Sequence, residues 1–443
     1  MSRPQPLSGF PELLPRQRIV EQQVVDHLRR AFELHGFANL QTRAVEPMDQ
    51  LLRKGETSKE VYVLRRLQAD AEGGDAGLGL HFDLTVPFAR YVLENAGKLN
   101  FPFRRYQIQP VWRGERPQEG RFREFWQADI DIVDVGELPA HYEVEVALVI
   151  ADALSGLPIP KVRMHVNNRK LSQGFYQGVG IADTDEALRI IDKLDKIGPD
   201  AVAKLLIEGV DATPEQAEAC LRLASISAED TSFVEEIRAL GVTDPLLEEG
   251  LNELAAVVDA VAKEAPGFVV ADMKIARGLD YYTGTVYEVF IEGQEHLGSV
   301  CSGGRYDKLA SDGKNTYPGV GLSIGVSRLL VPLLNSGALT ATREVPTCVL
   351  VALANEEERA AANGLAQRLR KRGIPTQVSP SAAKFGKQIK FADKRGIPFV
   401  LFANDEGTQI KDIRSGDQTT VDVDAWNPPA EDLHPSIVAA ETA

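Results

Sequence analysis

Residues 103–134 alternate apolar and polar side chains on either side of a loop, 114–123, and this pattern constrains the fold more than any other stretch of the chain. A period of two places alternate residues on opposite faces of a β-sheet. We therefore predict two strands whose apolar face, including Tyr106 and Ile130, packs on a core. The opposite face gathers polar side chains and one aromatic ring: Arg105, Gln107, Gln109, Arg113, Phe125, Gln127, Asp129 and Asp131.

Two interpretations fit this polar face. Antiparallel sheets often keep one side in water and charged residues are mostly exposed, so on this stretch alone a solvated face is the simpler one. Phe125 and the arginines at the strand end and in the loop favour a binding surface instead. Arginine presents a planar fork suited to phosphate and carboxylate groups, and an aromatic ring offers a stacking surface for a base. An anionic nucleotide would fit here.

Composition narrows the class of protein. The 443 residues suffice for two or three domains, and 44% hydrophobic residues allow a large core. No apolar run is long enough to span a bilayer and no signal-like segment follows Met1, so we expect a cytoplasmic protein with no membrane partner. A net charge of −15 argues against binding to bulk DNA. The three cysteines, at 220, 301 and 348, are too far apart for a CxxC metal site, and they argue against a disulfide framework.

The residues before the hairpin predict a helix and an extended segment. Helical spacing predicts a helix over 16–35, ended by Gly36. Residues 80–87 alternate cleanly, with apolar side chains on one side and His81, Asp83 and Thr85 on the other. Pro87 suits the first turn of a following helix. On spacing alone, helix capping or solvation is the simplest role for Asp83 and Thr85.

Two glycine-containing segments lie later in the chain. Residues 303–307 (GGRYD) are predicted as a turn after a strand near Val300. Residues 319–328 (GVGLSIGVSR) run from a strand into a helix, and their glycines let the backbone approach a ligand or a packed neighbour. This segment alone is weak evidence for a site, since it lacks the spacing of a phosphate-binding P-loop.

Changes in amino-acid composition and in the helix and strand patterns predict the domain organisation. Residues 167–264 are rich in Ala, Leu and Glu at helical spacing, and beyond 345 strand and helix patterns alternate as in a small α/β domain. The predicted parts are a catalytic domain of 1–166 and 265–330, a helical insertion of 167–264, a linker of 331–345, an α/β domain of 346–430 and a tail of 431–443.

A basic stripe marks the α/β domain. Lys387, Lys390 and Lys394 recur at three- and four-residue steps within 384–395, so they share one face of a helix. A charge stripe of this kind is usually a solvated helix face, and the alternative is an RNA contact. In a chain this acidic, the concentration of basic residues raises the second interpretation to equal weight.

Several of these motifs agree in order and spacing with one family. The chain resembles the histidyl-tRNA synthetases, which are class II aminoacyl-tRNA synthetases, over nearly its whole length. Residues 113–125 resemble class II motif 2, and 321–328 resemble motif 3. Residues 277–283 (RGLDYYT) and 303–307 resemble two signatures of the histidyl enzymes, and these make the match specific.

Two positions depart from the family pattern. Motif 1 is expected between Gly36 and Pro47, and Arg43 stands where its proline is expected. Motif 3 usually has an acid before its arginine, and this chain has Ser327. The departures concern the dimer contact and the support of Arg328.

The resemblance implies a fold and a reaction. It implies an α+β catalytic domain with a mostly antiparallel sheet, a helical insertion and a C-terminal anticodon-binding domain. The enzyme would use ATP, with Mg²⁺, to form histidyl-adenylate from L-histidine, and would then transfer the histidyl group to the 3′ end of tRNA(His). A homodimer is expected from the family. No covalent nucleophile is needed, so catalysis rests on positioning and charge stabilisation.

The resemblance also implies roles for individual residues. Arg113 and Arg277 would act on the α-phosphate as catalytic residues and would also contact histidine. ATP would be bound by Arg113, Glu115, Arg121, Phe125 and Arg328. Histidine would be bound by Asp83, Leu84, Thr85, Arg113, Gln127, Asp131, Arg277, Tyr281 and Tyr282. The tRNA would be contacted by Arg116, Gln118, Lys387, Lys390 and Lys394. No protein-bound metal site is expected.

Two other functions fit part of these features. One is a synthetase-like regulatory subunit of histidine biosynthesis, a class that lacks the C-terminal domain and the 277–283 segment. The other is a class II synthetase for proline, threonine or glycine, which shares a related C-terminal domain. The 277–283 segment disfavours both.

Overall fold

The computed structural model describes residues 4–52, 60–66, 77–276, 281–404 and 407–440. The chain divides into two compact units. The larger contains Met1–Pro11 and Val25–Pro332, and the smaller contains Glu12–Val24 and Leu333–Ala443. Helix α1, Pro15–Leu34, has residues in both. Within the described ranges, no helix has the length and apolar character needed to cross a membrane.

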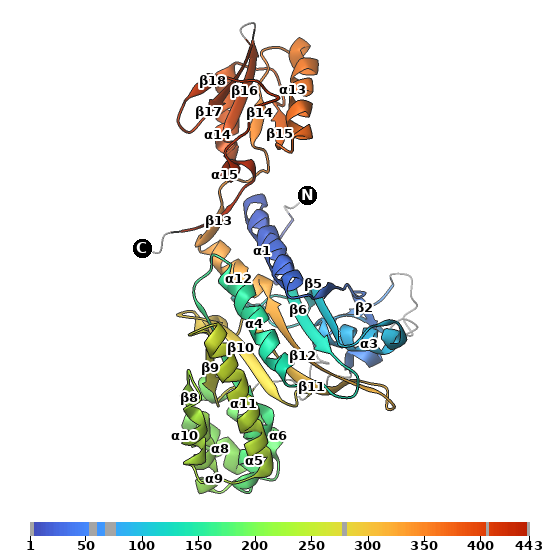
Figure 1. Cartoon of the computed structure of the whole chain (residues 1–443), viewed down its shortest axis with the longest axis vertical. Coiled ribbons are helices and arrows are strands. Elements are labelled where there is room, and N and C mark those ends of the chain that lie inside the picture. The colour runs from blue at the N-terminus through green and yellow to red at the C-terminus, as the bar shows by residue number, and fades with distance from the viewer. Residues whose placement is uncertain (1–3, 53–59, 67–76, 277–280, 405–406, 441–443) are drawn as a thin grey trace. The chain divides into compact units, whose positions relative to one another are not determined.

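The larger unit is built on a nine-stranded sheet (Figure 1). Its strand order is β1-β5-β6-β12-β11-β10-β7-β9-β8, and among the described strands only the β1–β5 and β7–β9 pairs are parallel. The predicted α+β fold with a mostly antiparallel sheet is confirmed. The strands are β1 Ala38–Asn39, β5 Phe103–Trp112, β6 Glu124–Val133, β7 Val162–Asn168, β8 Ser227–Ala228, β9 Val269–Asp272, β10 Thr285–Ile291, β11 Cys301–Ser311 and β12 Thr316–Gly325.

The predicted hairpin consists of β5 and β6, and its faces are those that the alternation predicts. In the antiparallel register Arg105 lies opposite Asp131, and Gln109 lies opposite Gln127. The polar face is buried, with an exposed fraction of 0% for Arg105 and 3% for Asp131. The solvated interpretation of this face is therefore wrong. Its charges pair with one another, and helix α3, Thr85–Asn95, covers part of it.

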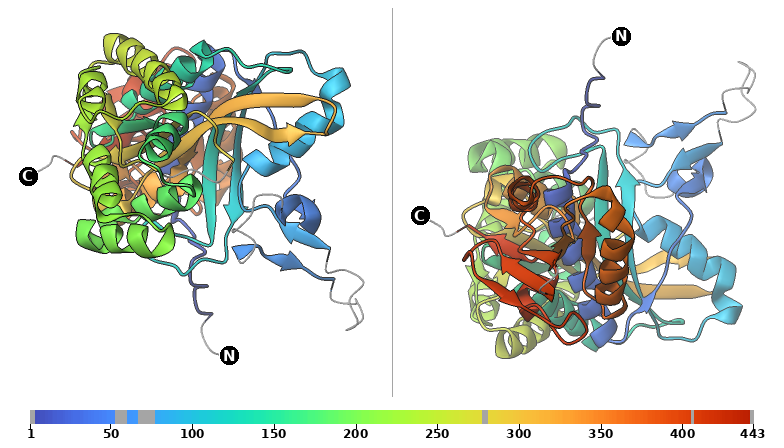
Figure 2. Two further views of the ribbon diagram at one scale, coloured as in Figure 1. Left: turned by 90° about the horizontal axis from the view of Figure 1, so that it is seen from below. Right: turned by 90° about the horizontal axis from the view of Figure 1, so that it is seen from above.

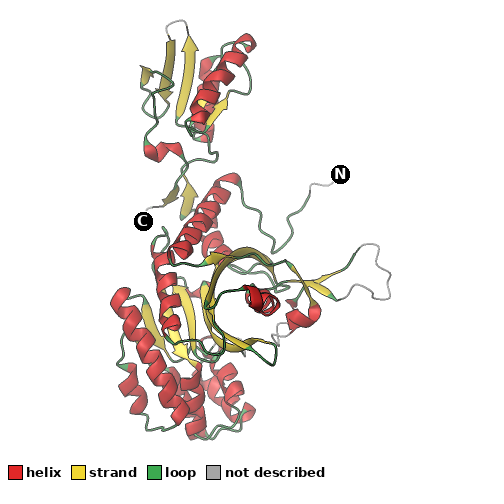
Figure 3. Ribbon diagram, turned by 45° about the vertical axis from the view of Figure 1, so that its right-hand side comes forward, coloured by secondary structure: helices red, strands yellow, loops and turns green. Residues whose placement is uncertain are grey.

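Helices pack on both faces of the sheet, which curves around a helix (Figure 3). Neighbouring residues of a strand point to opposite faces. The Arg105 guanidinium lies over the ring of Phe88 in α3, 4.3 Å from its centroid. The next residue, Arg104, forms an ion pair with Glu145 of α4, His141–Ser155. Helix α3 therefore covers the polar face, and α4 covers the apolar face.

The start of α3 corrects the prediction for residues 80–87. Strand β4, Leu78–Leu80, ends before the alternation does, and the helix already begins at Thr85. The Asp83 carboxylate accepts a hydrogen bond from the Val86 N–H at 3.2 Å. The N-cap residue of α3 is Leu84, so Asp83 satisfies this donor of the first helical turn from one residue before the N-cap.

A small sheet flanks this region, in the order β2-β4-β3, with β2 at Val45–Pro47 and β3 at Val63–Leu64, next to α2 at Met48–Leu51. Glu46 is fully buried here and pairs with Arg90 at 2.6 Å. Arg43, which replaces the expected motif 1 proline, adds a second ion pair to Glu46 at 3.1 Å. Arg43 thus helps to neutralise a buried carboxylate.

Residues 303–307 form no turn. They lie inside β11, which pairs with β10 and β12 and forms with β12 a long hairpin that reaches α3 (Figure 2). The glycines serve close packing between strands. A Cβ on Gly303 would lie 2.0 Å from the Gly321 carbonyl oxygen, and one on Gly304 would lie 3.0 Å from the ring of Tyr282. Glycine pairs usually indicate turns, and this one instead permits a close approach.

The region between β7 and β9 is mostly helical. A Cβ on Gly174 of α5 would lie 2.1 Å from the backbone nitrogen of Leu247 in α11, and one on Gly250 would lie 2.2 Å from that of Leu171. These glycines let the two helices pack backbone to backbone. The helices are α5 Arg169–Gly178, α6 Thr184–Ile191, α7 Leu194–Ile197, α8 Pro199–Gly209, α9 Pro214–Ala224, α10 Phe233–Arg238 and α11 Pro245–Glu264.

The smaller unit contains a five-stranded sheet in the order β15-β14-β16-β17-β18. Val349 packs with Ala362 of α13, and its neighbour Leu350 packs with Ala392 of α14, so the two helices lie on opposite faces. The elements are β14 Val349–Val351, α13 Arg359–Lys371, β15 Thr376–Val378, α14 Phe385–Arg395, β16 Phe399–Asn404, β17 Gly407–Asp412 and β18 Gln418–Thr420.

Residues 331–345, predicted as a linker, carry regular structure. Helix α12 runs from Val326 to Asn335. Strand β13, Leu339–Ala341, pairs with β19, Ile437–Ala439, in the predicted tail, which is preceded by α15, Ala430–Leu433. Local patterning does not signal a three-residue strand whose partner is far away in the sequence.

Candidate functional site

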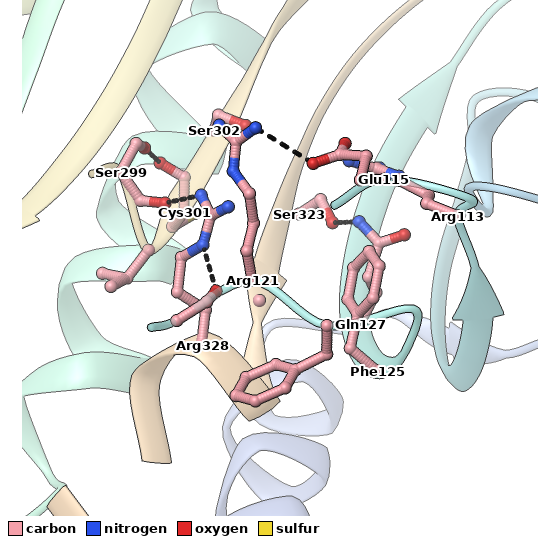
Figure 4. A pocket seen from close by; sticks show the side chains of 14 residues that line it. Arg113, Glu115, Arg121, Phe125, Gln127, Ser299, Cys301, Ser302, Ser323 and Arg328 are labelled. Carbon is pink, nitrogen blue, oxygen red and sulfur yellow. Dashed lines mark hydrogen bonds and ion pairs between the residues drawn. The ribbon is translucent and has the colours of Figure 1, made fainter. Parts of the chain in front are cut away.

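A pocket of about 540 Å³, open to solvent, lies where the loop after β5 meets β11, β12 and the start of α12 (Figure 4). It is lined by Arg113, Glu115, Gly120, Arg121, Phe122, Phe125, Gln127, Ser299, Val300, Cys301, Ser302, Ser323, Gly325 and Arg328. The lining contains three arginines and one acid, so the pocket is electropositive.

Arg113 follows the last residue of β5. Its Nε donates to the carbonyl oxygen of Phe82 at 2.9 Å, and its guanidinium lies 5.0 Å from the centroid of the Phe125 ring. These contacts hold the side chain at its stem. The Nη1 and Nη2 groups have no hydrogen-bond partner in the part of the chain that the structure describes, so they are available to an anion.

The other two arginines are paired with protein groups. Arg121 forms an ion pair with Glu115 at 3.0 Å. Arg328 donates from Nε to the Gly120 carbonyl oxygen at 2.9 Å and from Nη1 to that of Ser299 at 2.8 Å (Figure 4). Arg328 therefore joins the loop after β5 to the segment before β11.

Ser327 supports this arrangement, although the family pattern has an acid there. Its Oγ accepts a hydrogen bond from the Trp126 N–H at 2.9 Å, which ties the first turn of α12 to β6. The buried hydroxyl thus holds β6 against the helix that carries Arg328.

A buried network of charges lies on the same face of the sheet. Arg105 Nη2 pairs with Asp131 at 2.6 Å and lies 4.0 Å from Asp129. The Tyr306 hydroxyl donates to Asp131 Oδ1 at 2.6 Å. A Cβ on Gly321 would lie 2.1 Å from the same carboxylate oxygen, so glycine is required at that position of β12.

Burial dominates the protonation of this network. It raises the pKa of Asp129 to about 7, with Arg105 opposing the shift and Asp131 adding to it. Burial also raises the pKa of the Tyr282 hydroxyl, and Asp131 and Asp83 add to that effect. Tyr282 is therefore a neutral phenol that can donate a hydrogen bond.

Beside this network, hydrogen bonds join the two segments that resemble histidyl signatures, one ending at Thr283 and the other at 303–307. The Thr283 N–H donates to the Arg305 carbonyl oxygen at 2.9 Å, and the Thr283 hydroxyl donates to Asp307 at 2.5 Å. The preceding Tyr281 packs against Tyr306 with ring centroids 6.1 Å apart, and its hydroxyl donates to that of Tyr282 at 3.4 Å. The signatures thus form one wall that carries tyrosines.

A family model described as Histidyl-tRNA synthetase matches residues 9–329. The chain belongs to the histidyl-tRNA synthetase family. A second model, described as Anticodon binding domain, matches residues 347–426.

Individual relatives agree with the family. The histidine–tRNA ligases of Cutibacterium acnes and Micrococcus luteus are each 59% identical to this chain, covering 99% and 100% of both proteins. The crystal structure of histidyl-tRNA synthetase from Nostoc sp. PCC 7120 has a TM-score of 0.85 at 33% identity, covering 96% of this chain and 98% of the other.

The chain therefore catalyses the histidine–tRNA ligase reaction, in which ATP activates L-histidine and the histidyl group passes to the 3′ end of tRNA(His). The match over nearly the whole chain decides against a regulatory subunit and against a synthetase for another amino acid. The fold is that of class II enzymes, with a catalytic and a C-terminal anticodon-binding domain.

The structure brings most of the predicted site residues of this synthetase into one region. One pocket contains the five residues predicted for ATP together with Gln127. Asp131, Tyr281 and Tyr282 belong to the buried network, which Leu84 joins through a hydrogen bond from Arg105 to its carbonyl oxygen at 3.4 Å.

The other predicted residues lie outside the pocket. Asp83 and Thr85 flank Leu84 at the start of α3, and Arg116 and Gln118 are exposed in the loop after β5. The predicted tRNA-contacting lysines are exposed on α14 of the smaller unit: Lys387, Lys390 and Lys394. Arg277 lies outside the described residues.

Sequence reasoning missed several residues of the site. Arg105 and Asp129 were placed on the polar face without a role, and Tyr306 was seen only as part of a signature. The alternation and the signature were the available signals for them. Ser323 and the wall at 299–302 had no signal, because only the pairing of β12 with β6 and β11 brings them to the pocket.

The pKa of Asp129 predicts a pH dependence of stability. Because its pKa is higher in the folded protein than the ordinary value of 3.8, folding favours the protonated form, and stability falls as the pH rises from about 4 to about 7. Between pH 5 and 7 the loss is about 2–3 kcal/mol. Calorimetric melting midpoints should therefore fall with pH in the wild type, and less so in Asp129→Asn.

Asp312→Asn is the matched control, because hydrogen bonds from backbone N–H groups lower the pKa of this exposed acid instead. It should leave the decline between pH 5 and 7 intact. A wild type and an Asp129→Asn variant whose midpoints change in parallel with pH would show that Asp129 titrates normally.

Proposed function

We propose that the pocket binds ATP as its magnesium complex, and that the adjoining buried network binds L-histidine, so that Arg113 lies between the two substrates. The observation that carries this proposal is the grouping of Arg113, Glu115, Arg121, Phe125 and Arg328 in one pocket with Gln127. Cationic side chains gather at one end of this site and carboxylates at the other. That polarity suits a polyphosphate beside an ammonium group.

The first step is an in-line displacement. A carboxylate oxygen of histidine forms a bond to the α-phosphorus, the bond from that phosphorus to the bridging oxygen breaks, and pyrophosphate leaves with the electron pair. Negative charge grows on the α-phosphate oxygens, and the free Nη groups of Arg113 are suited to stabilise it. We assign the same task to Arg277 on the strength of the family resemblance.

Arg121 and Arg328 are assigned to the β- and γ-phosphates. Both have protein partners now, so ATP has to compete with Glu115 for Arg121. That ion pair is partly exposed, with side-chain fractions of 39% and 19%, so it is weak. Glu115 is the single carboxylate among the described lining residues, so Mg²⁺ would be held mainly by phosphate oxygens and water.

Adenine is assigned to the ring of Phe125, with Glu115 at its amino group. For histidine, Asp83 and Thr85 near the start of α3 and Gln127 on β6 suit the ammonium group, and the Leu84 backbone completes this loop. Asp131 and the neutral Tyr282 suit the imidazole, because one ring nitrogen donates a hydrogen bond and the other accepts one. Tyr281 lines this pocket.

In the second step the terminal ribose hydroxyl of tRNA(His) attacks the activated carbonyl carbon, and AMP leaves. We assign Arg116 and Gln118 to the acceptor end, residues 167–264 to a clamp on the acceptor arm, and the lysines of α14 to the anticodon loop. Single-stranded loop bases are the usual targets of sequence-specific RNA recognition. A homodimer and a cytoplasmic location remain predictions.

Replacing Arg113 tests the catalytic assignment. We expect Arg113→Gln to lower kcat for histidine-dependent ATP–pyrophosphate exchange by about 10²–10³-fold, because one charged donor to the transition state is lost. Arg104→Gln is the matched control. Arg104 is also an arginine of the β5 segment, but it points to the face opposite the site, where it pairs with Glu145. Exchange at a normal rate in Arg113→Gln would refute the role.

Replacing the lysines of α14 tests the tRNA assignment. The triple variant Lys387→Gln, Lys390→Gln and Lys394→Gln should raise KM for tRNA(His) and lower the slope of log KM against log salt by about 2, while pyrophosphate exchange stays normal. The control neutralises three exposed lysines of the larger unit, at positions 98, 308 and 314. Equal loss of both reactions would mean that the α14 lysines stabilise the fold instead.

A further inference from the structure

The side chain of Gln127 is held by a chain of two hydrogen bonds. Its Nε2 donates to Ser323 Oγ at 2.6 Å, and the Ser323 hydroxyl donates to Asp129 Oδ1 at 2.5 Å (Figure 4 shows the first of these). Gln127 Oε1 is buried and has no hydrogen-bond partner among the described residues. Gln127 and Ser323 both line the pocket.

The order of donors and acceptors determines which way the amide of Gln127 points. An ionised carboxylate can only accept hydrogen bonds, so the ionised Asp129 takes the hydrogen of the Ser323 hydroxyl. The Ser323 oxygen can then only accept from Gln127. A flipped amide would put two acceptor oxygens 2.6 Å apart, which is repulsive. The amide nitrogen therefore faces Ser323, and Oε1 is left for a ligand.

The sheet sets the positions of Gln127, Ser323 and Asp129, which together we call the relay. Ser323 of β12 lies directly opposite Asp129 of β6 in the antiparallel register, and Gly325 lies opposite Gln127. Asp129 is 1% exposed and lies 4.0 Å from the guanidinium of Arg105. Because the groups sit on paired strands, the relay has little freedom to rearrange.

We propose that Asp129 and Ser323 are positioning residues that orient the Gln127 amide, so that its Oε1 accepts a hydrogen bond from the α-ammonium group of histidine. The inference rests on the proposed function, which puts Gln127 at that group. The relay sets selectivity for ligands that carry the ammonium, since a ligand without it leaves a buried acceptor unpaired.

Two competitive inhibitors of pyrophosphate exchange separate this role from a structural one. L-Histidinol keeps the ammonium group, whereas 3-(imidazol-4-yl)propionate lacks it. We expect Ser323→Ala to raise Ki for histidinol about tenfold and to leave Ki for the propionate within about twofold, because only the first ligand uses Oε1. Asp129→Asn should raise the ratio of Ki for histidinol to Ki for the propionate by about threefold. The effect is smaller than for Ser323→Ala, since an amide can also donate to Ser323.

Three further variants complete the test. Ser323→Thr keeps the hydroxyl and should restore the wild-type ratio, and Ser311→Ala, on the same hairpin away from the pocket, should not change it. Gln127→Ala should raise the ratio of Ki for histidinol to Ki for the propionate, as Ser323→Ala does. A change with Gln127→Ala but none with Ser323→Ala would overturn the relay alone. No change with Gln127→Ala would overturn both the relay and the assignment of Gln127 to the ammonium group.

Discussion

The site depends on one buried guanidinium. Arg105 of β5 has no exposed surface. Its Nη2 lies 2.6 Å from the carboxylate of Asp131 and 4.0 Å from that of Asp129, both on the neighbouring strand β6. Removing one partner of a buried pair leaves an uncompensated charge, which costs about 3–5 kcal/mol. Arg105 therefore allows two acids to stand on the inner face of a sheet. Burial raises the pKa of Asp129 to about 7, so this end of the site carries acidic groups that suit an ammonium group.

The opposite polarity lies in the loop after β5 and at the start of α12. Arg113, Arg121 and Arg328 line the pocket with Glu115 as the single described acid, so anionic phosphates are favoured there. The two ends meet at Gln127 and Ser323, which lie on the paired strands β6 and β12. In the proposed reaction the carboxylate of histidine lies between them and reacts with the α-phosphate. Catalysis then needs few new contacts, because the charges are already in place.

Much of this arrangement could be predicted from the sequence, because it follows from local periodicity. The alternation of 103–134 identified both faces of the hairpin, and the strand-to-helix passage at 319–328 was correct. Tertiary contacts decided the rest. The 303–304 glycines look like a turn but accommodate a neighbouring strand and the ring of Tyr282. Residues 80–84 alternate but carry the chain into α3, and Ser323 reaches the site through a cross-strand pairing that no local pattern signals.

If these two ends form one active site, a single ligand should bind to both. A crystal structure with a non-hydrolysable sulfamoyl analogue of histidyl-adenylate would decide this. We expect the sulfamoyl group within hydrogen-bonding distance of the Arg113 guanidinium, the adenine against Phe125 and the imidazole against Asp131. An analogue bound in another cavity, or with its imidazole away from Asp131, would contradict it.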